Sequence, residues 1–186
     1  MRALVLAAFF CCVSVVGAPA AGIKRWKLER STVSYIVKHP FHRSRGESTT
    51  VRGRGKCDGE RCKFLVAAPI VSFVSKDRNR DIRMLKAMKA GAYPLVSVSA
   101  NLPDDLSRNY VIADLEVELA GVKSKYPQVR FEIEDSGGAF YHVSGAVSID
   151  IREFGIDAPM FFMLPISASV SIEIDAVWRI LPEGVK

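Results

Sequence analysis

The stretch Tyr110–Ala120 reads YVIADLEVELA, and it decides the fold expected for this chain. Its apolar residues occupy every second position and are Val111, Ala113, Leu115, Val117 and Leu119. Carboxylates fill positions between them and are Asp114, Glu116 and Glu118. Because successive side chains of an extended strand point to opposite faces, this period of two predicts a β-strand with one buried and one solvated face.

The same alternation, or a looser form of it, recurs in seven more segments. They are Trp26–His39, Glu47–Lys56, Lys63–Phe73, Leu95–Leu102, Gln128–Asp135, His142–Arg152 and Ser167–Arg179. Strands that each carry one apolar face bury it by packing together, and short turns between them favour antiparallel neighbours. We therefore expect one all-β domain, either a single antiparallel barrel or a sandwich.

One segment, Ser72–Pro94, interrupts the strands and has the pattern of a helix. Its apolar residues recur at a three-residue spacing and are Ile82, Leu85 and Met88. Cations lie between them and are Arg80, Arg83, Lys86 and Lys89. Asp77 suits the N-cap, while Gly91 and Pro94 mark the end. We expect this helix to lie with its apolar stripe across one end or flank of the sheet.

Residues 1–20 have the features of a secretory signal peptide. Arg2 gives a positive start, Ala3–Val16 is an apolar run, and Ala18-Pro19-Ala20 offers a cleavage site. The run is shorter than the roughly 20 apolar residues of a membrane-spanning helix. We therefore expect residues 21–186 to form the mature domain, exported to the periplasm.

Removal of this leader leaves two cysteines, Cys57 and Cys62. They flank the turn-like residues Asp58-Gly59-Glu60-Arg61 between two predicted strands. Because exported thiols meet an oxidising environment, we expect a disulfide that closes this hairpin. A pair of free thiols is the alternative, and a metal site is not expected, because two cysteines without a nearby histidine supply half of one.

The chain has a formal net charge of +6, and its cations are concentrated before and within the predicted helix. The strand cations are Arg43, Arg45, Arg52, Arg54, Lys56, Arg61 and Lys63. An exported protein is not expected to meet nucleic acid, so an anionic membrane surface or a phosphate-bearing lipid head is the better partner. A solvated basic surface without a partner is the alternative.

The predicted inner faces carry several small residues, which bear on what the interior holds. They are Ala68, Ala100, Ala113, Gly145 and Ala176. An eight-stranded barrel is wide enough either to be filled by its own side chains or to hold one small ligand. An apolar tunnel would bind a hydrocarbon chain. Patterning alone leaves the tunnel and the packed core open.

A second apolar feature is the run Met160–Leu164, between Pro159 and Pro165. An apolar run outside the predicted strands is expected to be covered or to meet an apolar partner. Phe161 and Phe162 would then lie at the mouth of a lipid-binding cavity, where flexible and flat side chains adapt to a chain. The alternatives are a plug in the barrel end and the interface of a homodimer.

Four motifs give the chain a resemblance to a known family. They are Ser31-x-Val33-x-Tyr35-x-Val37-x-His39, the segment Asp77…Arg80-Asp81…Leu85 that ends in Tyr93-Pro94, Gly121-Val122-Lys123, and Arg152…Phe154-Gly155. In this order they resemble the YceI-like family of exported, lipocalin-like proteins, over roughly Trp26 to Trp178. The resemblance implies an extended eight-stranded antiparallel barrel with one inserted helix. It also implies a polyisoprenoid chain, of the kind found on isoprenoid quinones, bound along the interior.

We therefore predict non-catalytic binding, storage or transport of a long apolar lipid. The expected contacts are Val33, Tyr35, Val37, Phe131, Ile133, Val147, Ile149, Phe161, Phe162, Val170, Ile172 and Trp178. No catalytic residue, metal or cofactor is expected, because His39, His42 and His142 are scattered and no phosphate loop or nucleophile motif occurs. The alternative is a packed barrel that docks through its basic helix and Met/Phe run.

Overall fold

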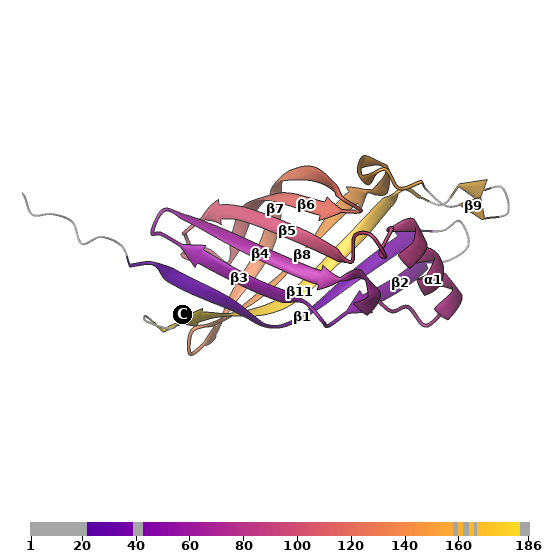
Figure 1. Cartoon of the computed structure of the whole chain (residues 1–186). Coiled ribbons are helices and arrows are strands. Elements are labelled where there is room, and N and C mark those ends of the chain that lie inside the picture. Colours follow the sequence, from indigo (N-terminus) through magenta and orange to yellow (C-terminus); the bar gives the residue numbers. More distant parts are fainter. Residues whose placement is uncertain (1–21, 39–42, 158–159, 162–163, 166, 183–186) are drawn as a thin grey trace, which may run out of the picture.

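The computed structural model describes residues 22–38, 43–157, 160–161, 164–165 and 167–182 (Figure 1). The predicted signal peptide lies outside these residues. The main strands are β1 (Lys24–Lys38), β2 (Arg43–Ser48), β3 (Arg52–Cys57), β4 (Arg61–Pro69), β5 (Leu95–Pro103), β6 (Tyr110–Leu119), β7 (Val122–Gly137), β8 (Phe140–Asp150) and β11 (Ser169–Leu181).

The described helices are short. They are η1 (Ile70–Ser72), α1 (Arg78–Ala87) and η2 (Ile151–Phe154), of which η1 and η2 are 3-10 turns. Two further strands of two residues each, β9 (Met160–Phe161) and β10 (Leu164–Pro165), pair with each other. No described helix has both the length and the apolar character needed to cross a membrane.

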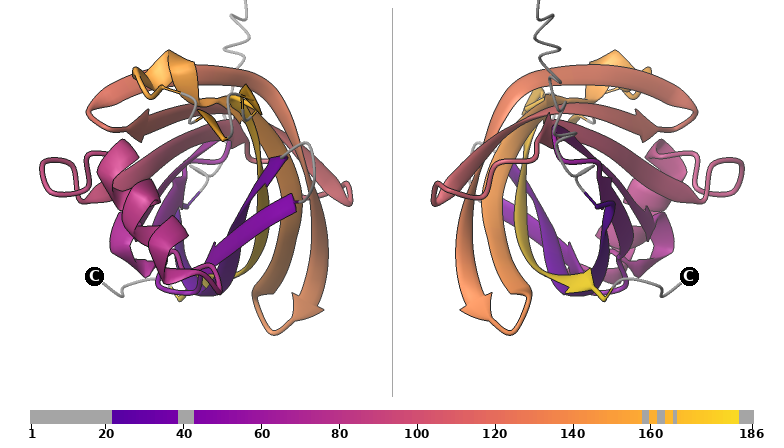
Figure 2. Two further views of the ribbon diagram at one scale, coloured as in Figure 1. Left: turned by 90° about the vertical axis from the view of Figure 1, so that its right-hand side faces the viewer. Right: turned by 90° about the vertical axis from the view of Figure 1, so that its left-hand side faces the viewer.

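The main strands close into an antiparallel barrel. Each neighbour in the order β11-β8-β7-β6-β5-β4-β3-β1 is hydrogen-bonded, and β11 pairs with β1 to complete the ring. This makes eight strand positions in the described chain, as the resemblance implies, and the views along the barrel show the ring (Figure 2). β2 shares the position of β3, because both pair with the same side of β1 in one register.

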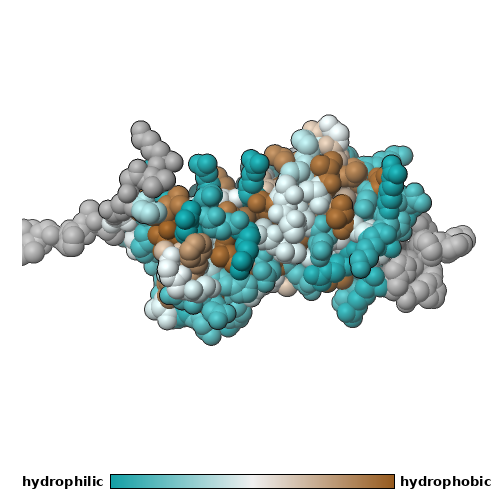
Figure 3. All heavy atoms as spheres, turned by 90° about the horizontal axis from the view of Figure 1, so that it is seen from below, coloured by the Kyte–Doolittle hydropathy of each residue, from teal (hydrophilic) through white to brown (hydrophobic). Residues whose placement is uncertain are grey.

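The alternation of β6 produces one buried and one outer face, as the sequence predicts. All five of its apolar residues named above are buried, from Val111 to Leu119. Asp114, which lies between them, is exposed. On the outer surface, hydrophilic and apolar side chains lie side by side (Figure 3).

Two irregularities change which residues of a strand face inward. In β1 the register shifts between Leu28 and Arg30, so Trp26 and Leu28 share the inner face with odd-numbered residues farther along. In the β6–β7 pair it shifts between Ala113 and Leu115. A bulge tolerates a proline within a strand, so Pro127 does not interrupt β7. The strand begins at Val122 and not at the expected Gln128.

The inserted helix α1 differs in part from the expected one. Asp77 is its N-cap, and its side chain accepts a hydrogen bond from the backbone N–H of Arg80 at 3.0 Å. The helix ends at Ala87, before Gly91. The expectation that Ile82 joins the apolar stripe is wrong, because this side chain is 54% exposed. The residues that pack against the barrel are Met84, Leu85 and Met88.

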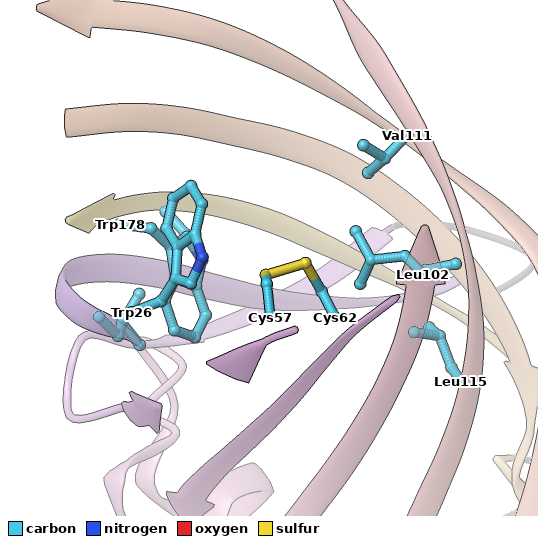
Figure 4. Packing of buried hydrophobic residues seen from close by; sticks show 10 residues of the cluster. Trp26, Cys57, Cys62, Leu102, Val111, Leu115 and Trp178 are labelled. Atoms are coloured by element: carbon cyan, nitrogen blue, oxygen red, sulfur yellow. A yellow bond between two sulfur atoms is a disulfide. The ribbon is translucent and has the colours of Figure 1, made fainter. Parts of the chain in front are cut away.

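The buried apolar residues form two clusters, one at each end of the barrel. The cluster at the disulfide end includes Trp26, Trp178 and Leu102 beside the cysteines (Figure 4). The cluster at the helix end includes Tyr35 and Ile70, with α1 packed against it. These two names, the disulfide end and the helix end, are used below.

The expected disulfide is present and joins Cys57 to Cys62. The two residues are also a directly opposed pair of β3 and β4, and both are buried. The bond therefore holds the tip of a hairpin whose side chains already pack inside the barrel. Because the closed loop is short, its effect on stability is small compared with that of a long-range bond.

We expect reduction of this disulfide to lower the free energy of unfolding by about 2 kcal/mol, as the loop-entropy relation gives for so short a loop. Urea unfolding of the oxidised and the reduced, alkylated protein measures the difference. The barrel strands should remain formed in the reduced protein, as judged by far-UV circular dichroism. A loss of the β-sheet signal on reduction would contradict this.

Candidate functional site

The candidate site is the inner face of the barrel. Cross-strand pairing places ten of the twelve predicted lipid contacts on this face. Four are buried: Tyr35, Ile149, Val170 and Trp178. Six are half-buried: Val33, Val37, Phe131, Ile133, Val147 and Ile172. The side chain of Phe161 and all of Phe162 lie outside the described residues, so their predicted place at the mouth stays a prediction.

Strand register brings most of these residues together on one wall. Tyr35 is opposite Ile172, which is opposite Val147. One step toward the helix end, Val37, Val170 and Ile149 form the next row. These rows cross β1, β11 and β8, and Phe131 continues the wall on β7. Trp178 lies apart from them, in the cluster at the disulfide end.

The opposite wall was missed in the predicted contacts. It is formed by inner-face residues of β4 and β5, which are Phe64, Val66, Val98 and Ala100. Their alternation was visible in the sequence and could have identified them. Trp26 and Leu28 were missed for another reason, since the bulge in β1 gives them the opposite numbering parity from Val33.

Three aromatic rings of the inner face lie against glycines of neighbouring strands. Tyr35 is opposite Gly46, Phe64 is opposite Gly55, and Phe131 is opposite Gly145. A Cβ atom placed on any of these glycines would collide with the ring opposite it. The rings therefore lie along the wall of the barrel, in the space that a side chain would otherwise fill.

Charge is confined to the rim of this inner face. Among the described strands, the charged residues that share the inner-face register are Lys24 and Asp135, both at the disulfide end. Lys24 Nζ lies 3.0 Å from a carboxylate oxygen of Asp104, whose side chain is 1% exposed. The lining between the ends offers hydrocarbon and little else, which favours an apolar ligand.

Polar groups occur at the helix end. The Tyr126 hydroxyl donates to Glu153 at 2.7 Å, and the Ser124 hydroxyl donates to the same carboxylate at 2.5 Å. Burial and the bond to Glu153 raise the pKa of Tyr126 to about 12. The two hydrogen bonds lower the pKa of Glu153. At neutral pH the Glu153 carboxylate is therefore charged, and it accepts hydrogen bonds from two neutral hydroxyl groups.

A few inner polar atoms are buried without a hydrogen bond. They are the Tyr35 hydroxyl, the Ser31 hydroxyl and the Trp26 indole nitrogen. Burial raises the pKa of Tyr35 and the Asp81 carboxylate raises it further, while the Ser75 side chain and the Arg80 charge lower it by less, so the phenol stays protonated at neutral pH. The Tyr35 hydroxyl at the helix end is thus a neutral donor that a ligand or a water molecule could satisfy.

The two described surface hollows lie outside the barrel. The larger, of about 530 Å³, is lined by Glu29, Arg30, Glu134, Ser136, Phe140, His142 and Val177, and the smaller shares Glu134 and His142 with it. His142 Nε2 is 2.9 Å from Asp175 Oδ2, on the outer face. His142 is therefore a hydrogen-bonded surface residue, while His39 and His42 lie outside the described residues.

One group of side chains in the described chain has the spacing of a metal site. It combines Cys57, Cys62 and Asp104, whose ligand atoms lie within 4.8 Å of one another. The two sulfur atoms are joined in the disulfide, and thiolates are what a metal would need. The Cys57–Cys62 disulfide and the ion pair of Asp104 with Lys24 therefore close the disulfide end of the barrel.

Comparison with solved structures finds proteins of the same architecture. BcnA of Burkholderia cenocepacia has a TM-score of 0.66 at 15% identity, covering 79% of this chain and 95% of that chain. A polyisoprenoid binding domain from Saccharophagus degradans, implicated in plant cell wall breakdown, has a TM-score of 0.69 at 13% identity, covering 87% and 99%. The YceI protein of Campylobacter jejuni has a TM-score of 0.54 at 14% identity, covering 98% and 100%.

The chain has the fold of the YceI-like proteins. At these identities the likeness concerns the fold. No family model matches the sequence, and no curated protein matches it. The YceI-like fold accounts for the closed barrel and for the helix inserted between β4 and β5.

We expect Gly145→Ala to destabilise the barrel by about 1–3 kcal/mol, the usual range for overpacking a core. The added Cβ would lie 2.6 Å from Phe131 Cδ1 and 3.2 Å from the Arg130 carbonyl oxygen, so the ring must move into the interior. Chemical unfolding measures the change.

The matched control is Gly91→Ala, because an added Cβ there meets nothing within 4 Å. Its effect should stay within about 0.5 kcal/mol, as for other surface substitutions. If the two variants lowered the free energy of unfolding equally, the collision with Phe131 would not be the cause of the Gly145→Ala effect.

Proposed function

We propose that this protein binds a long apolar lipid, of the polyisoprenoid or isoprenoid-quinone kind, inside its barrel. The lipid is stored or carried without covalent change, so the protein is not an enzyme and needs no cofactor or metal. The mature protein acts in the periplasm after removal of residues 1–20. A monomer suffices for this function, since all the lining residues belong to one chain.

The observation that carries this proposal is the half-buried state of the inner face. Six of the ten described contacts, Val147 and Ile172 among them, keep part of their surface accessible although their register points them inward. A core packed to normal density would bury such side chains. Accessible apolar surface inside a closed barrel supports room for a hydrocarbon chain.

Two further observations support an extended apolar guest. The ring of Phe131 lies over Gly145 of the wall. The ring of Phe64 lies over Gly55 and contacts the rings of Trp26 and Trp178, so it belongs to the closed disulfide end. The Saccharophagus degradans domain of the same fold is a polyisoprenoid binding domain. The Tyr35 hydroxyl, a buried neutral donor at the helix end, suits an uncharged head group with an oxygen acceptor.

The second candidate is a packed barrel that acts as a docking protein. The two closed clusters favour it, because buried side chains fill both ends of the interior. Such a protein would carry no lipid. A single extraction experiment therefore separates the two candidates.

We expect an organic extract of the purified protein, chain beginning at Ala21, to contain a lipid with a long apolar chain, identified by mass spectrometry. Val147→Phe should reduce the recovered lipid about tenfold, because overpacking the lining costs about 1–3 kcal/mol. Val147 is half-buried on the inner face, opposite Ile172.

The control variant is Ala146→Phe, at the exposed neighbouring position on the outer face of the same strand. It adds a ring to β8 without touching the interior, so its lipid content should equal that of the parent protein. A parent protein that releases no lipid, and takes up none when refolded with polyisoprenoids, would rule out the carrier.

A further inference from the structure

A continuous patch of cations covers the outer surface of three neighbouring strands. We call it the basic face, and it consists of Arg25 and Lys27 of β1, Arg52, Arg54 and Lys56 of β3, and Arg61 and Lys63 of β4. All seven residues are exposed. Five of these cations belong to the cluster seen in the sequence, and strand pairing adds Arg25 and Lys27 to the same surface.

Strand register brings these cations directly opposite one another. Arg25 pairs with Lys56, which pairs with Lys63, so one row across three strands is wholly cationic. Lys27 and Arg54 are opposite each other in the next parallel row. Side chains opposed in this way have Cβ atoms about 4.5–5.5 Å apart, and like charges at that spacing are destabilising.

Few carboxylates offset this repulsion. Lys27 lies 3.5 Å from Glu29, which is also paired with Arg179 at 2.9 Å. No carboxylate of the described residues is within ion-pair distance of Arg52, Arg54 or Lys63. The basic face thus contains at least three cations, Arg52, Arg54 and Lys63, that no described carboxylate pairs.

Elsewhere on the barrel, three cations have carboxylate partners. On β7 and η2, Lys123 pairs with Glu116, Arg130 pairs with Glu132, and Arg152 pairs with Asp150. The overall positive charge is therefore not spread evenly over the surface. Cations without a described carboxylate partner also lie on α1, among them Arg83 and Lys86. The basic face differs from α1 because strand pairing sets its cations opposite one another across three strands.

We propose that the basic face docks on an anionic lipid bilayer. The array lies on the outer side of a sheet and extends over three strands, which suits a plane of head groups. Neither of the two hollows described above is lined by a residue of the basic face, and both contain Glu134, so neither offers a small anion a site there. Clusters of four to eight cations are typical of proteins that bind anionic lipids, each contributing about 1 kcal/mol.

An exposed apolar side chain strengthens the assignment to a bilayer. Leu65 of β4 is 58% exposed and lies directly opposite Arg54, within the basic face. A leucine there can enter the boundary between head groups and acyl chains while the cations contact phosphate. Docking through this face would lay the strands along the bilayer. It does not depend on the proposed lipid cargo.

The test is co-sedimentation of the protein, chain beginning at Ala21, with vesicles of equal parts phosphatidylcholine and phosphatidylglycerol. Neutralising the unpaired cations, in the triple variant Arg52→Gln/Arg54→Gln/Lys63→Gln, should weaken binding about 100-fold. Added salt should weaken binding of the parent protein, and vesicles of phosphatidylcholine alone should not bind it.

Two variants with the same change of net charge serve as controls. Lys123→Gln/Arg130→Gln/Arg152→Gln removes three paired cations from other strands and turns, and Arg78→Gln/Arg83→Gln/Lys86→Gln removes three from α1. Both should bind within about threefold of the parent protein. Circular dichroism and thermal unfolding verify that each variant is folded.

Several results would overturn the proposal. If the first triple variant binds as the parent does, or if either control is weakened equally, the basic face is not the docking surface. Absence of parent binding to anionic vesicles, with binding to heparin instead, would identify a soluble polyanion as the occupant. Lipid extraction is unaffected by these outcomes, so cargo binding and docking fail or succeed separately.

Discussion

The pairing of β1 with β11 is the constraint on which the rest of the structure depends. It runs from Arg25 opposite Leu181 to Val37 opposite Val170, and it converts an open meander into a closed ring. Closure removes the sheet edges, and it gives every strand an inside and an outside. The apolar residues of β6 acquire a buried face only because the two chain-terminal strands meet on the other side of the barrel.

The inner and outer faces of the barrel then carry different kinds of side chain. The inner face is hydrocarbon with charge at its rim, closed by the Cys57–Cys62 hairpin at one end and by α1 at the other. The outer face is charged, with acids and bases paired on β7 and bases left together on β1, β3 and β4. The proposed binding of a lipid inside and the proposed docking on a bilayer outside are compatible, since they use opposite sides of the same strands.

Much of this could be predicted from local pattern, because a period of two reports which face a residue takes. The barrel, the disulfide, the Asp77 cap and most of one wall followed in that way. Register could not be predicted where the backbone bulges, so Trp26 was missed and the strand expected from Gln128 in fact begins at Val122. Ile82 fitted the helical spacing, yet α1 presents Met84, Leu85 and Met88 to the barrel and leaves Ile82 in solvent.

The opposition of Arg25 and Leu181 also determines where the ends of the domain lie. The first and last strands finish side by side at the disulfide end, so a short linker could join them without crossing the barrel. New termini could then be opened at Gly138-Ala139, the exposed turn between β7 and β8. The molecule is thus suited to circular permutation, which would keep the ring intact while reordering the chain that builds it.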